Sequence, residues 1–322
     1  MLSDRTRAPH AVVTGASGYL GRHLVSVLEA RGWRVTRCLR DARGVPNAVS
    51  VPDLDERALA AIPWPADTIF HLAGLAHRFP PNVPSEAEFE RVNAHGSGAV
   101  AHAAKGRARR FVFASSIAAI GARGEPPSTA YGRSKLHGEH AVIEALAGST
   151  TEAVILRFPA IYGACAPGAV SQLARWILRG RPLPSCARTT RRSMIAVENA
   201  VDACVFAAEN TRLAGITAVP TDRETLNVLD AAMTIARGGG TRVRTIPMPR
   251  FSLSLLGAIG SRCGITAMAS AERLLESTEV TDATLAEIAG WNPPISAQRA
   301  LAELGAALVR EATRDHASER AA

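Results

Sequence analysis

The stretch VVTGASGYLGRHLVSVLEARG at residues 12–32 constrains the fold of this chain more than any other. A short β-branched run that ends in a glycine precedes it and predicts a buried strand. Apolar residues at helical spacing follow it and predict a helix. Gly15, Gly18 and Gly21 lie between the two. The segment therefore predicts a strand, a tight glycine turn and a helix in succession.

Further apolar runs recur along the first half of the chain and predict more strands: WRVTRCL, DTIFHLAG, RRFVFASS and EAVILRFPAIYG. A helical stretch over 93–104 separates the second and third of these. Alternation of strands and helices indicates βαβ units and a parallel sheet covered on both faces. We expect an α/β fold, a Rossmann-type doubly wound parallel sheet with a smaller C-terminal α/β lobe.

The composition of the chain changes after Gly163, where proline and arginine become frequent. RSMIAV and ETLNVL are the clearest strand candidates there, and LARWILRGRPLPS predicts an amphipathic helix followed by an extended segment. We therefore divide the chain into a first domain, residues 1–162, which contains the glycine stretch, and a smaller second lobe, residues 163–322. Some segments of the second part are expected to return to the first domain.

Composition excludes several classes of protein. No apolar run approaches the length needed to cross a bilayer, and the first ten residues hold no signal-peptide core, so we expect a cytoplasmic protein without membrane insertion. The five cysteines show no CxxC spacing, which favours a reducing compartment and no metal site. The net charge of +8 is spread along the chain without interleaved aromatic residues, which indicates a solvated surface rather than nucleic-acid binding.

The glycine turn gains a function from its context. Gly15 permits the tight turn, Gly18 lets the backbone approach a pyrophosphate, and Gly21 lets the helix pack closely on the strand. Phosphates are then expected at the N-terminus of the helix, where free N–H groups and the helix dipole favour anions. The same loop supplies three more expected cofactor contacts: Ser17, Tyr19 and Leu20.

The end of the second strand determines how the cofactor's ribose is recognised. A carboxylate at this point hydrogen-bonds a 2′-hydroxyl, as in NAD sites. This chain has Arg40 there, followed by Asp41. A guanidinium pairs well with a 2′-phosphate, so NADP(H) is favoured. NAD(H) stays possible, because Asp41 reaches the ribose if the register differs by one residue.

The segment YGRSK places Tyr131 and Lys135 four residues apart, on one face of a predicted helix. A lysine ammonium beside a phenol favours the phenolate and lowers the pKa of the tyrosine, so that the phenol exchanges a proton with a carbonyl or alcohol oxygen. Ser115 and Ser116 end the preceding strand, where a hydroxyl can hold the reacting oxygen. These residues predict a redox site.

The Gly-x-x-Gly-x-x-Gly spacing of TGASGYLG, the strand-end serine and the YxxxK pair together resemble the extended branch of the short-chain dehydrogenase/reductase superfamily. The resemblance runs from Ala11 to about Leu304. It implies that Ser116, five residues before Gly121, is the catalytic serine beside Tyr131 and Lys135.

The resemblance also implies further cofactor contacts. Those residues lie in VPDLDE, in HLAG and in RFPAIYG: Asp53, Leu54, Leu72, Ala73, Gly74, Phe158 and Ile161. Asn93, in VNAHGSG, matches an asparagine of the helix behind the site. Two roles are open for it, a direct contact with the cofactor or a hydrogen bond to backbone.

The C-terminal half carries the substrate residues that the resemblance implies. RRSMIAVENAVDA resembles a signature in which an arginine holds a nucleotide-sugar diphosphate, which points to Arg192, with Asn199 in place of the usual aspartate. Arg273 is a candidate for a second phosphate contact. Within the branch, the chain looks most like bacterial reductases that form UDP-N-acetylquinovosamine or UDP-N-acetylfucosamine.

We therefore expect an NADP(H)-dependent 4-ketoreductase of a UDP-linked 4-keto-6-deoxy-N-acetylhexosamine, a homodimer that serves surface polysaccharide synthesis (O-antigen or capsule). The alternatives are a UDP-hexose 4-epimerase with retained NAD and, from another class, a non-catalytic dinucleotide-binding scaffold. Two features depart from the resemblance: a short segment between Ser116 and Tyr131, and Ala169 or Val170 where relatives place an asparagine. Either departure implies a different sugar or a more open pocket.

Overall fold

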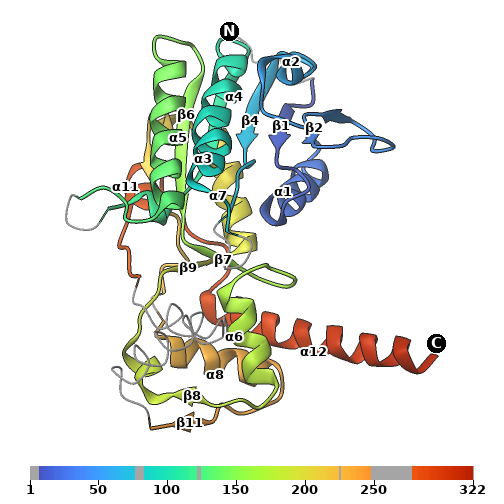
Figure 1. Ribbon diagram of the computed structural model, residues 1–322, viewed down its shortest axis with the longest axis vertical. Helices are drawn as coiled ribbons and strands as arrows, with labels where there is room; N and C mark the ends of the chain where they lie inside the picture. The colour runs from blue at the N-terminus through green and yellow to red at the C-terminus, as the bar shows by residue number, and fades with distance from the viewer. Residues whose placement is uncertain (1–6, 77–82, 122–124, 225, 248–277, 322) are drawn as a thin grey trace.

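The computed structural model describes residues 7–76, 83–121, 125–224, 226–247 and 278–321, and these form an upper lobe around a sheet and a lower lobe beneath it (Figure 1). Seven strands of the described residues form one sheet in the order β10-β6-β5-β4-β1-β2-β3, and every adjacent pair is parallel. The sheet confirms the predicted α/β fold. Its strands are β1 (His10–Thr14), β2 (Arg34–Leu39), β3 (Ala48–Ser50), β4 (Ala66–His71), β5 (Ala108–Ser116), β6 (Glu152–Phe158) and β10 (Thr217–Ala218).

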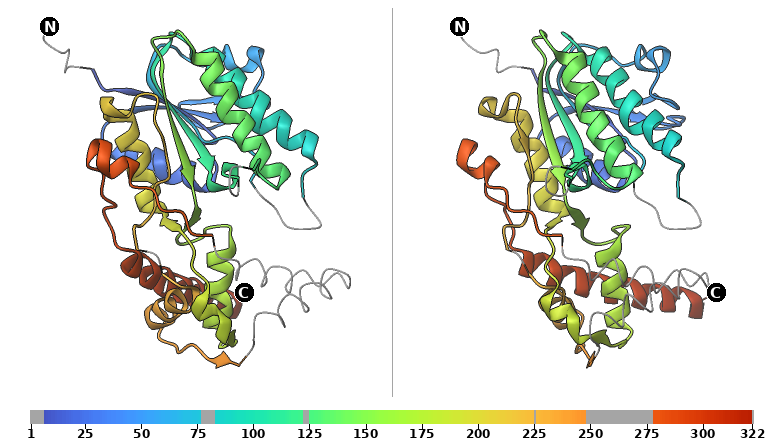
Figure 2. Two further views of the ribbon diagram at one scale, coloured as in Figure 1. Left: turned by 90° about the vertical axis from the view of Figure 1, so that its left-hand side faces the viewer. Right: turned by 60° about the vertical axis from the view of Figure 1, so that its left-hand side comes forward.

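Helices cover both faces of this sheet, as Figures 1 and 2 show. One face carries α1 (Tyr19–Ala30) and α7 (Val197–Glu209), and the other carries α4 (Gly96–Ala104) and α5 (Ala130–Leu146). A separate hydrophobic cluster fills the space on each side. Strands buried on both faces explain the nearly continuous apolar runs in the sequence. Shorter helices complete this lobe: α2 (Glu56–Leu59), α3 (Glu86–Phe89) and α11 (Thr284–Ala289).

The first helix shows how local sequence sets these elements. Leu24, Val25 and Leu28 are buried on one side of α1, at the spacing that the sequence predicted. The helix ends at Ala30, and Gly32 follows with φ of +79°. A left-handed residue just beyond the last turn is a common helix stop, and glycine adopts it without steric cost. Gly32 therefore ends this helix.

The lower lobe is built from residues beyond β6. It contains a two-stranded parallel sheet of β7 (Ala160–Tyr162) and β9 (Met194–Ala196), and another of β8 (Leu183–Pro184) and β11 (Thr245–Ile246). A third hydrophobic cluster joins its helices, α6 (Ala169–Leu178), α8 (Val228–Gly238) and α12 (Ala297–Ala321). The segments of α7 and β10 pass back to the upper lobe, where β10 pairs with β6.

Three predicted elements differ from the structure. EAVILRFPAIYG forms two strands in different sheets, because Pro159 has no N–H to donate and the chain changes direction there. ETLNVL was predicted as a strand, but Asn227 caps the start of α8, accepting a hydrogen bond from the Asp230 N–H. The stretch over 93–104 begins inside a π-helical turn, Glu90–His95, and only then becomes α-helical.

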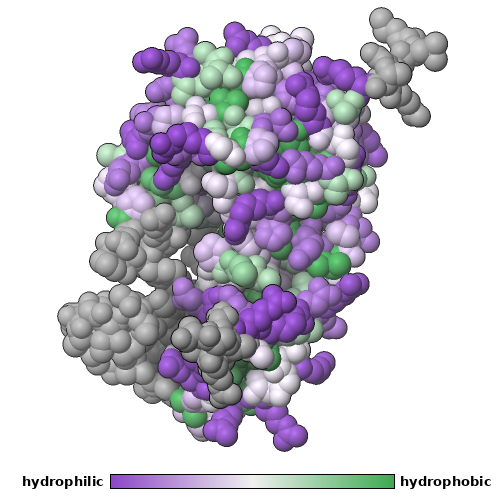
Figure 3. All heavy atoms as spheres, turned by 90° about the vertical axis from the view of Figure 1, so that its right-hand side faces the viewer, coloured by the Kyte–Doolittle hydropathy of each residue, from purple (hydrophilic) through white to green (hydrophobic). Residues whose placement is uncertain are grey.

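On the face drawn in Figure 3, hydrophilic side chains spread over both lobes and apolar ones form small separate groups. Within the described residues, no helix has the length and apolar character to span a membrane.

Candidate active site

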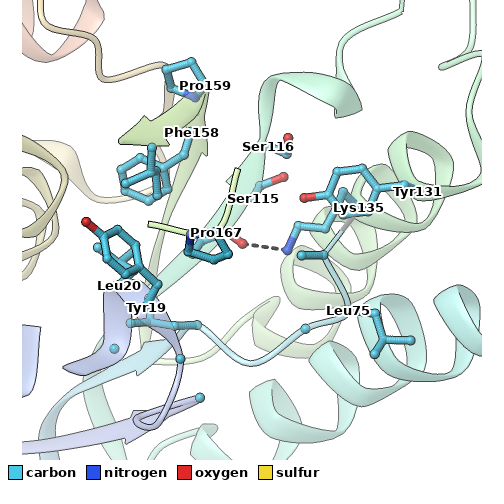
Figure 4. A pocket seen from close by; sticks show the side chains of 18 residues that line it. Tyr19, Leu20, Leu75, Ser115, Ser116, Tyr131, Lys135, Phe158, Pro159 and Pro167 are labelled. Carbon is cyan, nitrogen blue, oxygen red and sulfur yellow. Dashed lines mark hydrogen bonds between the residues drawn. The ribbon is translucent and has the colours of Figure 1, made fainter. Parts of the chain in front are cut away.

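A cavity of about 290 Å³ opens at the carboxyl ends of β1, β4 and β5, where the glycine turn faces α5 (Figure 4). Parallel sheets of this kind bind ligands outside the carboxyl ends of their strands. Most of the predicted site residues line the cavity: Gly15, Gly18, Tyr19, Leu20, Gly21, Leu72, Gly74, Ser116, Tyr131, Lys135, Phe158 and Ile161. Residues more than a hundred positions apart in the sequence therefore meet at one place.

The glycine turn forms a close-fitting cradle. A Cβ on Gly15 would lie 2.7 Å from the Ala73 nitrogen, and one on Gly21 would lie 2.2 Å from the Gly15 oxygen. Gly15 also has φ of +70°, in the left-handed region. Gly18 caps α1, and no side chain caps this helix or places a carboxylate in its first turn. Free N–H groups at an uncapped helix end suit a pyrophosphate, so these residues fit a dinucleotide.

The predicted catalytic side chains face the same cavity. Ser116 ends β5, and its hydroxyl makes a hydrogen bond with the Tyr131 phenol. Lys135, one helical turn after Tyr131, donates to the Ala114 carbonyl at 2.6 Å. Figure 4 shows all three side chains around the cavity. The neighbouring Ser115 also lines the cavity, and its hydroxyl donates to Glu139 of α5 at 2.5 Å. Of the two serines, Ser116 is the one whose hydroxyl lowers the pKa of Tyr131.

Burial controls the electrostatics of these side chains. It raises the pKa of Tyr131, and the hydrogen bond from Ser116 opposes this only in part. It lowers the pKa of Lys135 to about 8, while the carboxylate of Glu139 acts in the opposite direction. The sequence predicted that Lys135 lowers the pKa of Tyr131. In the structure the ammonium is bonded to backbone, and desolvation of the phenol has the larger effect.

Asn93 lies behind the cavity and is fully buried. Its side chain accepts from the Leu75 N–H at 2.8 Å and donates to the Leu75 carbonyl and the Ser134 hydroxyl. Ser134 in turn donates to the Tyr131 carbonyl. Of the two roles left open by the sequence, the structure shows the bond to backbone. Asn93 thereby ties the segment after β4 to the start of α5, from within the π-helical turn that the sequence did not indicate.

The two ribose candidates differ in their surroundings. Arg40 is exposed just beyond β2, and among the described residues no acidic side chain pairs with it. The Asp41 carboxylate binds the Arg43 guanidinium through both oxygens, at 2.6 to 3.0 Å. The Arg40 guanidinium is therefore available to a ligand, whereas the Asp41 carboxylate is already bound to Arg43.

Several predicted cofactor residues do not line the cavity: Ser17, Ala73, Asp53 and Leu54. Ser17 is exposed on the turn, and Ala73 provides backbone beneath Gly15. Asp53 pairs with Arg91 at 3.0 Å on the surface. Leu54 packs against Gly96 at the start of α4.

The predicted substrate arginine lies elsewhere. Arg192 lines a second, mostly apolar cavity in the lower lobe, together with Ala169 and Val170. Both candidates for the one position where the resemblance implies an asparagine, Ala169 and Val170, therefore face the same space as Arg192. Asn199 is buried and donates to the Asp222 carboxylate at 2.7 Å, so it holds structure together rather than facing either cavity. Arg273 lies outside the described residues.

Six further residues line the first cavity: Ser115 and Pro159, which adjoin predicted residues, and Leu75, Ala76, Ala114 and Pro167, which were not predicted. Leu75 and Ala76 directly follow HLAG, and Ala114 directly precedes Ser115. Each is next to a predicted motif, so a prediction that included the neighbours of each motif would have found all three. Pro167 is in the loop before α6, and no pattern in the sequence indicates that this loop reaches the cavity.

Comparison with known proteins identifies the family. Residues 11–217 match the NAD dependent epimerase/dehydratase family. A ceramide reductase of Caulobacter vibrioides is 38% identical over 197 residues, which span 58% of this chain and 57% of that protein. A UDP-glucose 4-epimerase of Vibrio cholerae is 24% identical over 328 residues, 95% of this chain and 98% of that one.

A solved structure of similar fold contains both a dinucleotide and a nucleotide. The Bordetella bronchiseptica enzyme WbmG, in complex with NAD and UDP, superimposes with a TM-score of 0.72 at 16% identity, over 96% of each chain. At that identity the likeness establishes the fold. Together with the family match over most of the chain, these findings confirm the resemblance to the extended branch. The chain belongs to the NAD-dependent epimerase/dehydratase family and is an enzyme of the NAD(P)-dependent oxidoreductase type.

Proposed function

We propose that this enzyme is an NADP(H)-dependent 4-ketoreductase of a UDP-linked 4-keto-6-deoxy-N-acetylhexosamine, in the synthesis of a surface polysaccharide. One observation carries the redox part of the proposal: Ser116, Tyr131 and Lys135 face one cavity whose opposite wall is the glycine turn. The bound dinucleotide supplies the hydride. The Tyr131 phenol gives a proton to the carbonyl oxygen, Ser116 holds that oxygen, and the Lys135 ammonium stabilises the phenolate left behind.

The sugar part of the proposal rests on the RRSMIAVENAVDA segment and on relatives and fold neighbours that include nucleotide-sugar enzymes. Arg192 would bind the diphosphate from the lower lobe. The direct test is incubation of the purified protein with the UDP-4-keto sugar and NADPH. We expect loss of NADPH absorbance and a reduced UDP-sugar. Interconversion of UDP-hexoses around a retained NAD, without net oxidation of NADPH, would indicate the epimerase instead.

The preference for NADP(H) depends on Arg40. Because a charge-assisted hydrogen bond contributes about 1.5–3 kcal/mol, Arg40→Gln should weaken NADPH binding about tenfold or more and leave NADH binding nearly unchanged. Fluorescence titration with both cofactors measures this. Equal losses for NADPH and NADH would show that Arg40 does not contact the 2′-phosphate.

A second candidate is reduction of a ketone in a ceramide-class lipid. The relative that favours it is the ceramide reductase, at 38% identity against 24% for the epimerase. The cavity around Arg192 also agrees with it, since its walls are mostly apolar and include Ala169 and Val170, one of which stands where the resemblance implies an asparagine. NADPH oxidation with a keto-ceramide, and none with the UDP-4-keto sugar, would select this candidate.

A further inference from the structure

A buried carboxylate lies directly behind the catalytic residues and has no role in the chemistry above. Glu139 is on α5, so that Tyr131, Lys135 and Glu139 follow one another at four-residue spacing on one helix face. Lys135 is 6% exposed and Glu139 is 2% exposed. Burial of a charge is costly unless the charge is paired and hydrogen-bonded. The partners of Glu139 therefore indicate what it does.

Two strands hold this carboxylate. The Arg157 guanidinium, on β6, donates to it through Nε at 2.9 Å and Nη2 at 2.5 Å, and the Ser115 hydroxyl, on β5, donates at 2.5 Å. Ser115 and Arg157 are paired directly across the β5–β6 ladder. Glu139 thus links α5 to two adjacent strands by hydrogen bonds. These bonds lie next to the end of β5, where Ser116 lines the cavity.

Lys135 is held immediately next to this cluster. Its ammonium donates to the carbonyl of Ala114, the residue before Ser115, and lies 4.7 Å from the centre of the Phe113 ring. Desolvation lowers the pKa of the amine to about 8, and the Glu139 carboxylate opposes that change. His71, facing Lys135 from β4, is fully buried, and burial lowers its pKa to about 3, so it is neutral at physiological pH. Among the described residues, Glu139 is thus the carboxylate whose charge raises the pKa of Lys135.

We propose that Glu139 is a positioning residue of the redox site: its carboxylate, fixed by Arg157 and Ser115, keeps the Lys135 amine in the ammonium form and holds Lys135 and Tyr131 against the end of β5. The inference rests on the proposed oxidoreductase chemistry, in which the ammonium assists Tyr131. In Glu139→Gln the shape remains, but the negative charge is lost while the positive charge of Arg157 stays. Burial and the remaining cation both favour a neutral amine.

The test uses an unusual property of the sequence: Lys105 and Lys135 are its only lysines. Selective isotope labelling of lysine therefore gives two side-chain signals in NMR, and the exposed Lys105 is an internal reference. We expect the Lys135 titration midpoint to fall by about one pH unit or more in Glu139→Gln, because a close opposite charge shifts a pKa by about 1–3 units. Lys105 should not move.

A matched control removes the same charge from the same helix. Glu144 is exposed on α5, so Glu144→Gln should leave Lys135 at its wild-type midpoint. Equal midpoints in Glu139→Gln and Glu144→Gln would overturn the proposal. If Glu139→Gln does not fold, Glu139→Asp can be used instead, because its side chain is one methylene shorter and moves the carboxylate away. An unchanged titration midpoint of Lys135 in this variant would also contradict the proposal.

The titration needs neither substrate nor cofactor, so its result is valid even if the enzyme reduces a ketone other than the proposed one. With an active substrate, the alkaline limb of kcat/KM should move to lower pH in Glu139→Gln by the same amount as the NMR midpoint. A merely structural role would reduce activity equally at every pH, and that result would refute the link to Lys135.

Discussion

Gly15→Ala tests whether the glycine turn must lie against the end of β4. The substitution acts in two ways. Gly15 has φ of +70°, which a side chain tolerates poorly, and its new Cβ would lie 2.7 Å from the Ala73 nitrogen and 2.8 Å from the Leu72 carbonyl carbon. Those neighbours are backbone at the end of β4, so they cannot move aside as a flexible side chain could.

The magnitude follows from these two contributions. A left-handed alanine costs about 1–2 kcal/mol. Overpacking against fixed atoms adds about 1–3 kcal/mol. Gly32→Ala separates them, because Gly32 has φ of +79° but no atom within 4 Å of its Cβ position. Gly32→Ala should bear only the cost of the left-handed alanine and not that of overpacking. The two variants should therefore differ by about 1–3 kcal/mol in free energy of unfolding.

Chemical denaturation and NADPH titration measure both effects. We expect Gly15→Ala to be the less stable variant and to bind NADPH about tenfold or more weakly, since 1.4 kcal/mol corresponds to about a factor of ten. Gly32 lies outside the cavity, so Gly32→Ala should bind NADPH normally. Equal stability of the two variants, with unchanged NADPH binding, would refute the idea that close approach of the turn to β4 forms the site.

Three further changes have defined outcomes. Tyr131→Phe should lower kcat by about 10²–10⁴-fold with little effect on NADPH affinity, and a fully active variant would remove the tyrosine from the mechanism. Tyr162→Phe should lower the free energy of unfolding in urea by about 1–3 kcal/mol, because the buried Asp222 carboxylate loses a donor at 2.7 Å, and no loss would contradict that. Burial lowers the pKa of His71 to about 3, so its contribution to stability is complete above about pH 6.5 and is lost as the pH falls toward 3, by at most about 1.4 kcal/mol per pH unit. His71→Gln should flatten this dependence, and a slope equal to that of the wild type would count against a buried neutral imidazole.

Much of the site could be predicted because its motifs are local. The strand, turn and helix around Gly15 follow from residues adjacent in sequence, and the spacing of Tyr131 and Lys135 places both on one helix face. Contacts between distant segments could not be predicted. Arg192 belongs to a signature visible in the sequence, but only the fold shows that it lines a cavity of the lower lobe, separate from the cavity that Tyr131 lines.

The sequence by itself therefore determined the class of fold, and it indicated the glycine turn and the side chains that we propose to react. Tertiary structure decided what each group faces. Ser115 and Ser116 look alike in sequence, but in the fold Ser115 donates to the buried Glu139 and Ser116 interacts with Tyr131, two residues of α5 that lie eight positions apart. The charge on Lys135 likewise depends on burial and on a carboxylate held by Arg157 from another strand. Burial and cross-strand contacts exist only in the folded chain, so no local pattern encodes them.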